Sequence, residues 1–383
     1  MRKRIFILIS FVLLFKTILI GQCPDRNTFL QQVNQIFDSS KLSLSERTSE
    51  LLIKLESIEN CPYKNDSIHA MLLRTIGALY YSQRDYFNAA KYFDFSAGLI
   101  RTNYNSPAIK KNVLLSTYLW LSIFYDTLGN HPKQMEAVDN CIEIAKDLNA
   151  YSDLSCVWAL LKKTENCFDL GDYNNCISYA TMCEKFGWKC ADENRKNPNP
   201  TYYTSASECA LNSLGWHIDA LLKLNDYKTA SELLTDNFEV YKKKGNRRYY
   251  GMIYDQLAEV SMHNKDYNKA LTLLNQSLRF EEEAGNYFNC KQELNTIAFD
   301  IYFNYYKDND RALAYYRKAL GYSYRDKSIL KKDSMESLHI YDRMAQVYVR
   351  EHLFDTAFKY FQIAFDQIKQ GINETEVSHF PMV

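Results

Sequence analysis

The sequence predicts an all-α solenoid of about seven helical hairpins behind an N-terminal helical cap, and three observations support this prediction. The chain of 383 residues has only 12 Gly and 7 Pro, which disfavours a turn-rich β architecture and favours long helices. It contains 30 Tyr and 21 Phe, and large aromatic side chains supply much of the area buried between stacked helices. One short pattern recurs at intervals of 40 to 54 residues, as expected of a repeat array.

The recurring pattern is a polar turn, usually ending in an aromatic residue, followed by a helix that opens with a small residue. A clear copy runs from Arg84 to Ala89, and another from Lys265 to Ala270. The small residue lets two antiparallel helices approach closely, and bulky residues fill the space toward the next hairpin. The second helices of the successive copies are expected to begin near Ala89, Gln134, Cys176, Ala230, Ala270, Ala312 and Ala357.

This pattern resembles the tetratricopeptide repeat (TPR), whose turn reads Gly-Asp-Tyr-x-x-Ala. Gly77 with Tyr80 is similar to the small and aromatic pair in the first helix of that repeat. The resemblance implies a right-handed superhelix over residues 66–370, preceded by a helical cap at 22–65 and followed by a short tail at 371–383. The longest interval holds a polar, Pro-containing run from Ala191 to Pro200, which we expect to form an exposed loop.

The first 21 residues have the pattern of an export signal. A basic start is followed by an unbroken apolar run from Ile5 to Phe15, which suits a signal peptide and is too short to span a bilayer. We therefore expect an exported protein, periplasmic or extracellular. Membrane association is expected only if the leader stays uncleaved or if Cys23 carries a lipid, and both alternatives remain open.

The charge of the chain argues against a nucleic-acid partner. Lys and Arg together number 46, equal to Asp and Glu, and four of the basic residues lie in the leader. Without them no basic excess remains to hold a phosphate backbone.

Seven of the ten cysteines fall into two groups. Cys141, Cys176 and Cys183 occupy positions where the repeat requires a small core residue, and free cysteine packs as a small hydrophobe. Two other pairs bracket loosely held segments and are candidate disulfides, namely Cys23 with Cys61 around the cap and Cys190 with Cys209 around the loop. No Cys-x-x-Cys is present, so neither a metal site nor a cofactor is expected.

Motifs for catalysis are missing from the sequence. There is no Gly-x-Gly for a nucleotide, no Gly-x-Ser-x-Gly and no His-Glu-x-x-His. The sequence therefore favours a non-catalytic scaffold that binds a protein or an extended peptide.

The resemblance also implies where binding occurs, because first helices line the concave groove of a TPR array. The early repeats place Met71, Arg74 and Tyr81 at groove positions, but the basic clamp that grips a peptide carboxylate in some family members is missing. Acidic and aromatic residues occupy the equivalent positions further along, and they suit a peptide that carries Lys or Arg. These candidate groove residues are Trp158, Glu165, Phe168, Asp219, Asp255, Glu259 and Asp342. The alternative is that they form solvated helix faces and packing contacts.

A second functional class remains open. Long TPR arrays behind a signal sequence resemble the sensory regions of bacterial regulators, in which a membrane helix and an output module follow the array. Only thirteen residues follow Gln370 in this sequence. The alternative function is therefore the sensory part of a shortened or split two-component or transcriptional regulator.

Overall fold

The computed structural model describes residues 23–64, 66–103, 106–197, 199–244, 249–323 and 332–377, and the regular elements within these ranges are all helical. The predicted all-α solenoid is confirmed. The chain divides into two compact units, Met1–Ser213 and Leu214–Val383, and each is described by itself. The expected signal peptide, residues 1–21, lies outside the described residues.

The first unit begins with two helices ahead of the repeats and continues with three hairpins. Its helices are α2 (Arg26–Phe37), α3 (Leu44–Ser57), α4 (Ser67–Ser82), α5 (Tyr86–Asn103), α6 (Pro107–Ile109), the π-helical η1 (Lys110–Leu114), α7 (Leu115–Thr127), α8 (His131–Asp147), α9 (Leu154–Asp169) and α10 (Tyr173–Glu193). Consecutive pairs α4 with α5, α7 with α8 and α9 with α10 pack together as hairpins.

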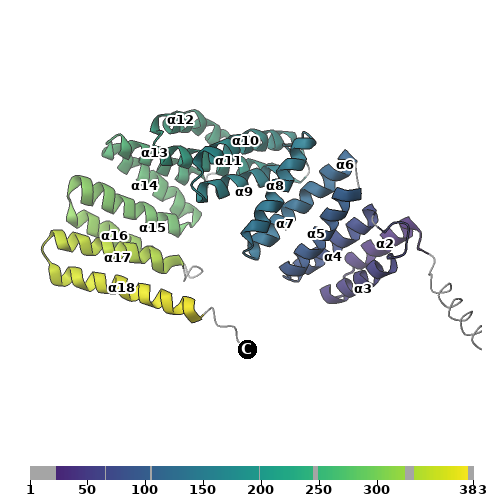
Figure 1. The fold of residues 1–383 in the computed structure, drawn as a ribbon. Helices are drawn as coiled ribbons and strands as arrows, with labels where there is room; N and C mark the ends of the chain where they lie inside the picture. The colour runs from purple at the N-terminus through teal and green to yellow at the C-terminus, as the bar shows by residue number, and fades with distance from the viewer. Residues whose placement is uncertain are drawn as a thin grey trace, which may run out of the picture. The chain divides into compact units, whose positions relative to one another are not determined.

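The second unit continues the same alternation. Helix α11 (Pro200–Lys223) runs across the division between the units, and the others are α12 (Tyr227–Lys244), α13 (Tyr250–His263), α14 (Tyr267–Ala284), α15 (Tyr287–Thr296), the π-helical η3 (Ile297–Tyr306), α16 (Asn309–Ser323), α17 (Lys332–Arg350) and α18 (Phe354–Val377). From α13 onward each helix packs on the next one along the chain (Figure 1). Helix α18 continues past Gln370, where the last hairpin was expected to end.

One turn geometry closes all seven hairpins. The residue before each second-helix N-cap is left-handed, with φ between 58° and 74°. The next backbone N–H donates to a carbonyl in the last turn of the first helix at 2.8–2.9 Å, as in a Schellman-type C-cap. In six turns an Asp or Asn side chain then accepts from the N–H three residues on, which caps the second helix. The seven left-handed residues are Arg84, Gly129, Gly171, Asn225, Lys265, Lys307 and His352.

The N-terminal helices are held by a crosslink and a small core. Cys23 and Cys61 form a disulfide with their Cα atoms 5.6 Å apart, which is the pairing expected around this segment. The Tyr63 hydroxyl donates to the Pro24 carbonyl at 2.5 Å. Phe29 of α2 and Leu51 of α3 are fully buried in the same cluster, so both helices are fastened to the start of the repeats.

The second expected disulfide is absent from the structure. Cys190 and Cys209 are both free and buried, and they serve as small packing residues on α10 and α11. The loop between these helices is held by amide hydrogen bonds instead. Asn194 Nδ2 donates to the Cys190 carbonyl at 2.9 Å, and Asn197 Nδ2 donates to Asn194 Oδ1 at 3.1 Å. These bonds order the start of the loop without a crosslink.

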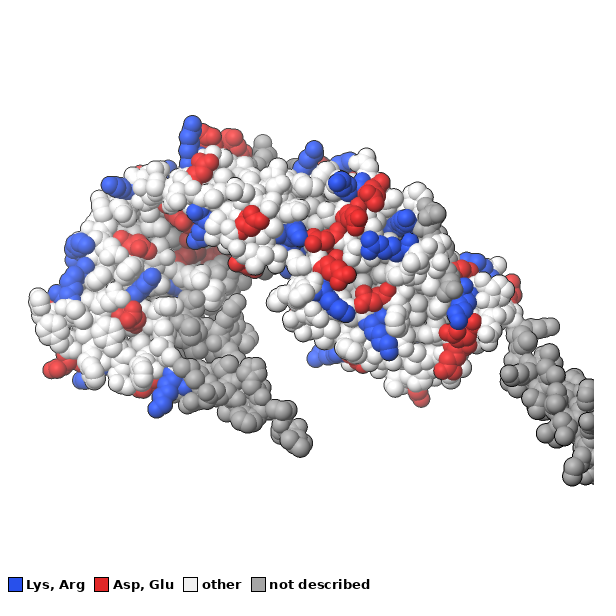
Figure 2. Space-filling view, viewed as in Figure 1, with Lys and Arg blue, Asp and Glu red and all other residues white. Residues whose placement is uncertain are grey.

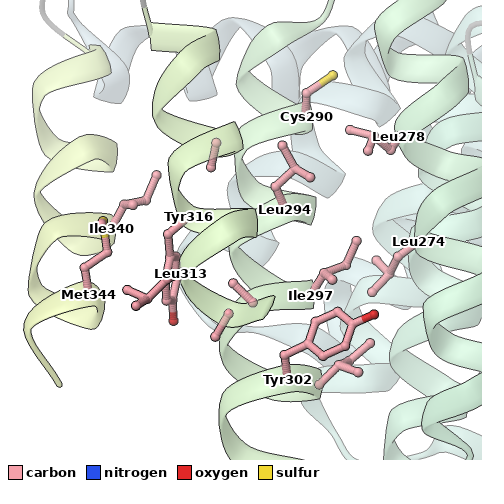
Figure 3. Close-up of a cluster of buried hydrophobic side chains, with 14 of the residues drawn as sticks. Leu274, Leu278, Cys290, Leu294, Ile297, Tyr302, Leu313, Tyr316, Ile340 and Met344 are labelled. Carbon is pink, nitrogen blue, oxygen red and sulfur yellow. The ribbon is translucent and has the colours of Figure 1, made fainter. Parts of the chain in front are cut away.

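The core of the second unit is continuous across several helices (Figure 3). Leu274 of α14, Leu294 of α15, Tyr316 of α16 and Met344 of α17 are all buried in it. Segment η3 contributes ten consecutive π-helical residues to this core. Such a long π segment is rare, and π segments often occur at functional sites. The wider winding sets the spacing of the turn that follows, where Asp308 N–H reaches back six residues to Tyr302.

Candidate functional site

Two hollows lined mainly by first helices of the repeats, one in each unit, differ in chemistry. The hollow of the first unit has a volume of about 400 Å³ and is largely apolar. Its aromatic wall consists of Tyr81 on α4 with Trp120 and Phe124 on α7, and the Tyr81 and Trp120 ring centroids lie 5.2 Å apart. Arg74 is the cation among its lining residues, and its Nη2 donates to Ser116 Oγ at 3.2 Å.

The hollow of the second unit has a volume of about 380 Å³ and is lined mainly by polar side chains from α13, α14, α15, η3 and α17. Four of its lining residues are acids, and Arg343 is the basic one. Arg343 lies with its guanidinium carbon 4.2 Å from the centroid of the Phe299 ring, in a cation–π contact. The described residues that line it are Met252, Asp255, Glu281, Asn289, Gln292, Glu293, Asn295, Thr296, Asp300 and Arg343.

The acidic region continues beyond the hollow along α11 and α13. Gln256 Nε2 donates to Asp219 Oδ1 at 2.9 Å and to the Gly215 carbonyl at 3.1 Å, which ties the two helices together. Burial raises the pKa of Asp219 to about 6. Burial, followed by the charges of Glu259, Asp219 and Glu281, raises the pKa of Asp255 to about 7.

The pKa of Asp255 is raised although its side chain still meets solvent. Its side chain retains substantial accessible surface, yet desolvation is the main cause of its raised pKa. A carboxyl in a concave site touches water on one side while protein replaces the water around it on the others. Glu259 also has a raised pKa, and burial is again the main cause. We call Asp219, Asp255 and Glu259 the acidic wall.

Two buried acids, Glu281 and Glu293, lie close to this wall. Glu281 and Glu293 are each only 4% exposed, and burial raises the pKa of Glu293 to about 9. Gly251 of α13 makes room for Glu281, because a Cβ atom at this position would lie 2.1 Å from Glu281 Oε1. The close approach of α13 and α14 at this glycine therefore places Glu281 at the hollow.

The seven candidate groove residues are divided between the two units. Trp158, Glu165 and Phe168 lie on α9 in the first unit, where Lys162 Nζ pairs with Glu165 Oε2 at 2.7 Å. Phe168 packs edge-on against Tyr173, with ring centroids 5.4 Å apart.

The other four lie in the second unit, where the structure brings Asp219, Asp255 and Glu259 together as the acidic wall. Asp342 on α17 accepts a hydrogen bond from Gln346 at 2.8 Å.

The buried acids of the hollow, Glu281 and Glu293, were not among the candidate residues. Cys290, Glu293, Leu294 and Ile297 follow the spacing of one helix face, and Glu293 stands in this otherwise apolar stripe. A carboxyl in a buried helix stripe is rare unless it is paired or protonated. That mismatch is the signal that could have identified Glu293.

The described part of the chain has neither a candidate membrane span nor a metal-binding cluster. No helix there is both long and apolar enough to cross a membrane. Within the same ranges, no three His, Cys, Asp or Glu side chains are grouped so that they could hold a metal ion.

Seven hairpins with one shared turn geometry define the class of this protein, a TPR-type helical solenoid. No family model and no curated protein matches the sequence. The fold is similar to that of the quorum sensor NprR from B. thuringiensis, with 14% identity, a TM-score of 0.52, and coverage of 84% of this chain and 82% of that one.

Two further solved structures share the fold at the same 14% identity and a TM-score of 0.50. Aspartyl phosphate phosphatase F from Bacillus subtilis matches over 93% of this chain and 88% of that one. The STAND protein PH0952 from Pyrococcus horikoshii, which has a tetratricopeptide repeat sensor, matches over 94% of this chain and 50% of that one. Similarity at this identity establishes the fold alone.

Proposed function

We propose that the protein is a non-catalytic scaffold that binds a protein or an extended peptide outside the cytoplasm, and that the acidic wall of the second unit recognises Lys or Arg in that partner. The observation that carries the proposal is the grouping of Asp219, Asp255 and Glu259, whose pKa values are all raised. Burial makes each acid costly to ionise, and it outweighs Lys223, whose charge acts to lower the pKa of Asp219 and Glu259. A basic side chain of the partner would reduce that cost further. The export half of the proposal rests on residues 1–21.

The test compares two pools of fluorescein-labelled decapeptides that carry either Lys or Gln at every third position. We expect the full chain to bind the Lys pool in preference to the Gln pool, and the double variant Asp255→Asn/Glu259→Gln to lose that preference. The matched control is Glu232→Gln/Asp236→Asn, which changes an equal charge on α12, where both residues are exposed. Equal binding of the two pools by the unmodified chain would refute the proposed recognition.

A sensory role is the second candidate function. It is supported by the fold that this chain shares with the quorum sensor NprR and with PH0952, which has a tetratricopeptide repeat sensor. The test is the coding DNA beyond Val383. A continuation that encodes a membrane helix and an output module would favour the sensor over the stand-alone scaffold.

A further inference from the structure

Glu293 lines the hollow of the second unit and has one buried carboxyl oxygen without a hydrogen bond to any described residue. The residue lines the hollow although its side chain is 96% buried, with 4% of its surface exposed. Its Oε2 has no hydrogen-bond partner among the described residues. A buried carboxyl oxygen without a partner is costly, so this atom marks a place where a ligand donor would be stabilised.

The other oxygen of Glu293 reveals where its proton is. Ser277 Oγ lies 2.7 Å from the Gly251 carbonyl oxygen and also within hydrogen-bond distance of Glu293 Oε1. A hydroxyl has a single hydrogen to donate, and an ionised Glu293 would leave two acceptors competing for it. Both contacts are satisfied if Glu293 is protonated and donates to Ser277, while Ser277 donates to Gly251. The raised pKa of Glu293, caused mainly by burial, agrees with this arrangement.

The charges around Glu293 are mostly negative. Asp255 of α13 and Glu281 and Glu282 of α14 all act to raise its pKa further, and Asp300 of η3 lines the same hollow. On its own helix, Lys291 is two residues away and therefore points to a different side; it is buried and has contacts of its own.

Arg343 of α17 is the basic lining residue, and it does not balance these acids. Its guanidinium is stacked on Phe299, and its charge acts on Asp300, whose pKa is nevertheless raised because burial outweighs the arginine. The hollow therefore combines several carboxyl groups with one cation, and it has space for a second cation.

We propose that this hollow takes one ammonium or guanidinium group, the tip of a Lys or Arg side chain, and that Glu293 releases its proton to solvent as the group enters. No covalent bond changes: the carboxylic acid becomes a carboxylate that pairs with the incoming cation, and Oε2 gains a donor. Met252 supplies apolar surface for the aliphatic stem of the side chain. The proposal rests on the proposed function, for which it names a specific subsite and a proton-linked mode of recognition.

The test is isothermal titration of the full chain with n-butylguanidinium at pH 7.5, in phosphate and in Tris. These buffers differ in ionisation enthalpy, so the difference in heat reports protons released. We expect about one proton per bound cation. We expect Glu293→Gln to bind at least about tenfold more weakly, which corresponds to about 1.4 kcal/mol, and to release fewer protons. The glutamine amide can donate to Ser277 as the protonated acid does, so this variant preserves the fold.

The control is Glu232→Gln, which should bind n-butylguanidinium as the unmodified chain does. Unchanged affinity in Glu293→Gln, or binding without proton release, would overturn the inference.

A second arm separates this inference from the proposed function by using a decapeptide with one central Lys and its norleucine counterpart. If Glu293→Gln keeps the preference for the Lys peptide, the subsite at Glu293 is refuted and the proposed scaffold function is not. Binding of n-butylguanidinium that depends on Glu293, with no preference for the Lys peptide, would instead refute the peptide as the source of the cation.

Discussion

The two hollows have similar volumes and the same kind of helical frame, yet their chemistry is opposite. In the first unit, the contacting rings of Tyr81, Trp120 and Phe124 form the wall, and Arg74 is the charged lining group. In the second unit, carboxyl groups dominate, among them Glu281 and Glu293. The turns and the small packing residues fix the frame in both, so the residues that face the groove are free to differ. The frame determines where a ligand could bind, and the facing residues determine which ligand.

The largest effect on stability is expected from removing one ring of the aromatic wall of the first hollow. Phe124 is fully buried and contacts Tyr81, Trp120 and Phe93. Phe124→Ala should lower the free energy of unfolding of the first unit by about 3–5 kcal/mol, measured by urea denaturation. Leu128→Ala, at a 42% exposed side chain, should cost less than about 0.5 kcal/mol. Equal losses in the two variants would contradict a packed wall.

A smaller effect is expected at the glycines that let paired helices meet. A Cβ atom on Gly77 would lie 2.5 Å from the Phe93 ring, so Gly77→Ala should cost about 1–3 kcal/mol through overpacking. Gly98→Ala adds a methyl group where no atom lies within 4 Å, and should stabilise its helix by about 0.5–1 kcal/mol. Urea denaturation measures both changes. Midpoints that shift in the same direction for Gly77→Ala and Gly98→Ala would contradict the close approach of the paired helices at Gly77.

The acids of the second unit should make its stability depend on pH. The pKa values of Asp219, Asp255 and Glu293 are raised to about 6, 7 and 9, so the folded state holds more protons than the unfolded state above about pH 4. Stability must therefore fall as pH rises from about 5 to 9. Thermal unfolding at pH 5, 7 and 9 measures this fall, and Glu293→Gln should flatten its upper part, between pH 7 and 9. A variant as pH-dependent as the parent would contradict a protonated Glu293.

The smallest effect concerns a turn. Lys265 has a φ of 62°, a conformation that costs a residue with a Cβ atom about 1–2 kcal/mol. Glycine avoids this cost, but its greater freedom in the unfolded state cancels part of the gain. Lys265→Gly should therefore stabilise the second unit by up to about 1 kcal/mol, measured by urea denaturation. Lys269→Gly, inside α14, should destabilise it by about 1 kcal/mol. Destabilisation by both changes would show that the turn does not favour glycine.

The sequence predicted the features that depend on neighbours along the chain. The turn pattern identified all seven hairpins because the N-cap, the left-handed residue and the small residue lie within six positions of one another. The pairing of Cys23 with Cys61 was predictable for a similar reason, since one short helix pair separates them. Cys190 and Cys209 also bracket a segment that was expected to be loosely held, but both are free and buried, and asparagine amides hold the start of the loop between them.

Features that depend on the spacing between repeats were not predictable in the same way. The hollow of the second unit combines residues from Met252 to Arg343, and no local pattern relates them. The π-helical winding of η3 also lacks a signal in composition, although it determines which side of the segment Asp300 occupies. Glu293 alone left a trace, as a carboxyl in an apolar stripe.

The shared turn also explains why a protein with this fold can be hard to recognise by sequence. Glycine fills the left-handed position at Gly129 and Gly171 only, while the other five turns use Arg, Asn, Lys or His. The backbone hydrogen bond that closes the turn involves no side chain, so it constrains residue identity weakly. A profile that expects glycine there would pass over five of the seven turns. The backbone geometry of this repeat therefore tolerates more sequence change than its residue pattern does. Such a repeat is detected better by comparing backbones than by comparing sequences.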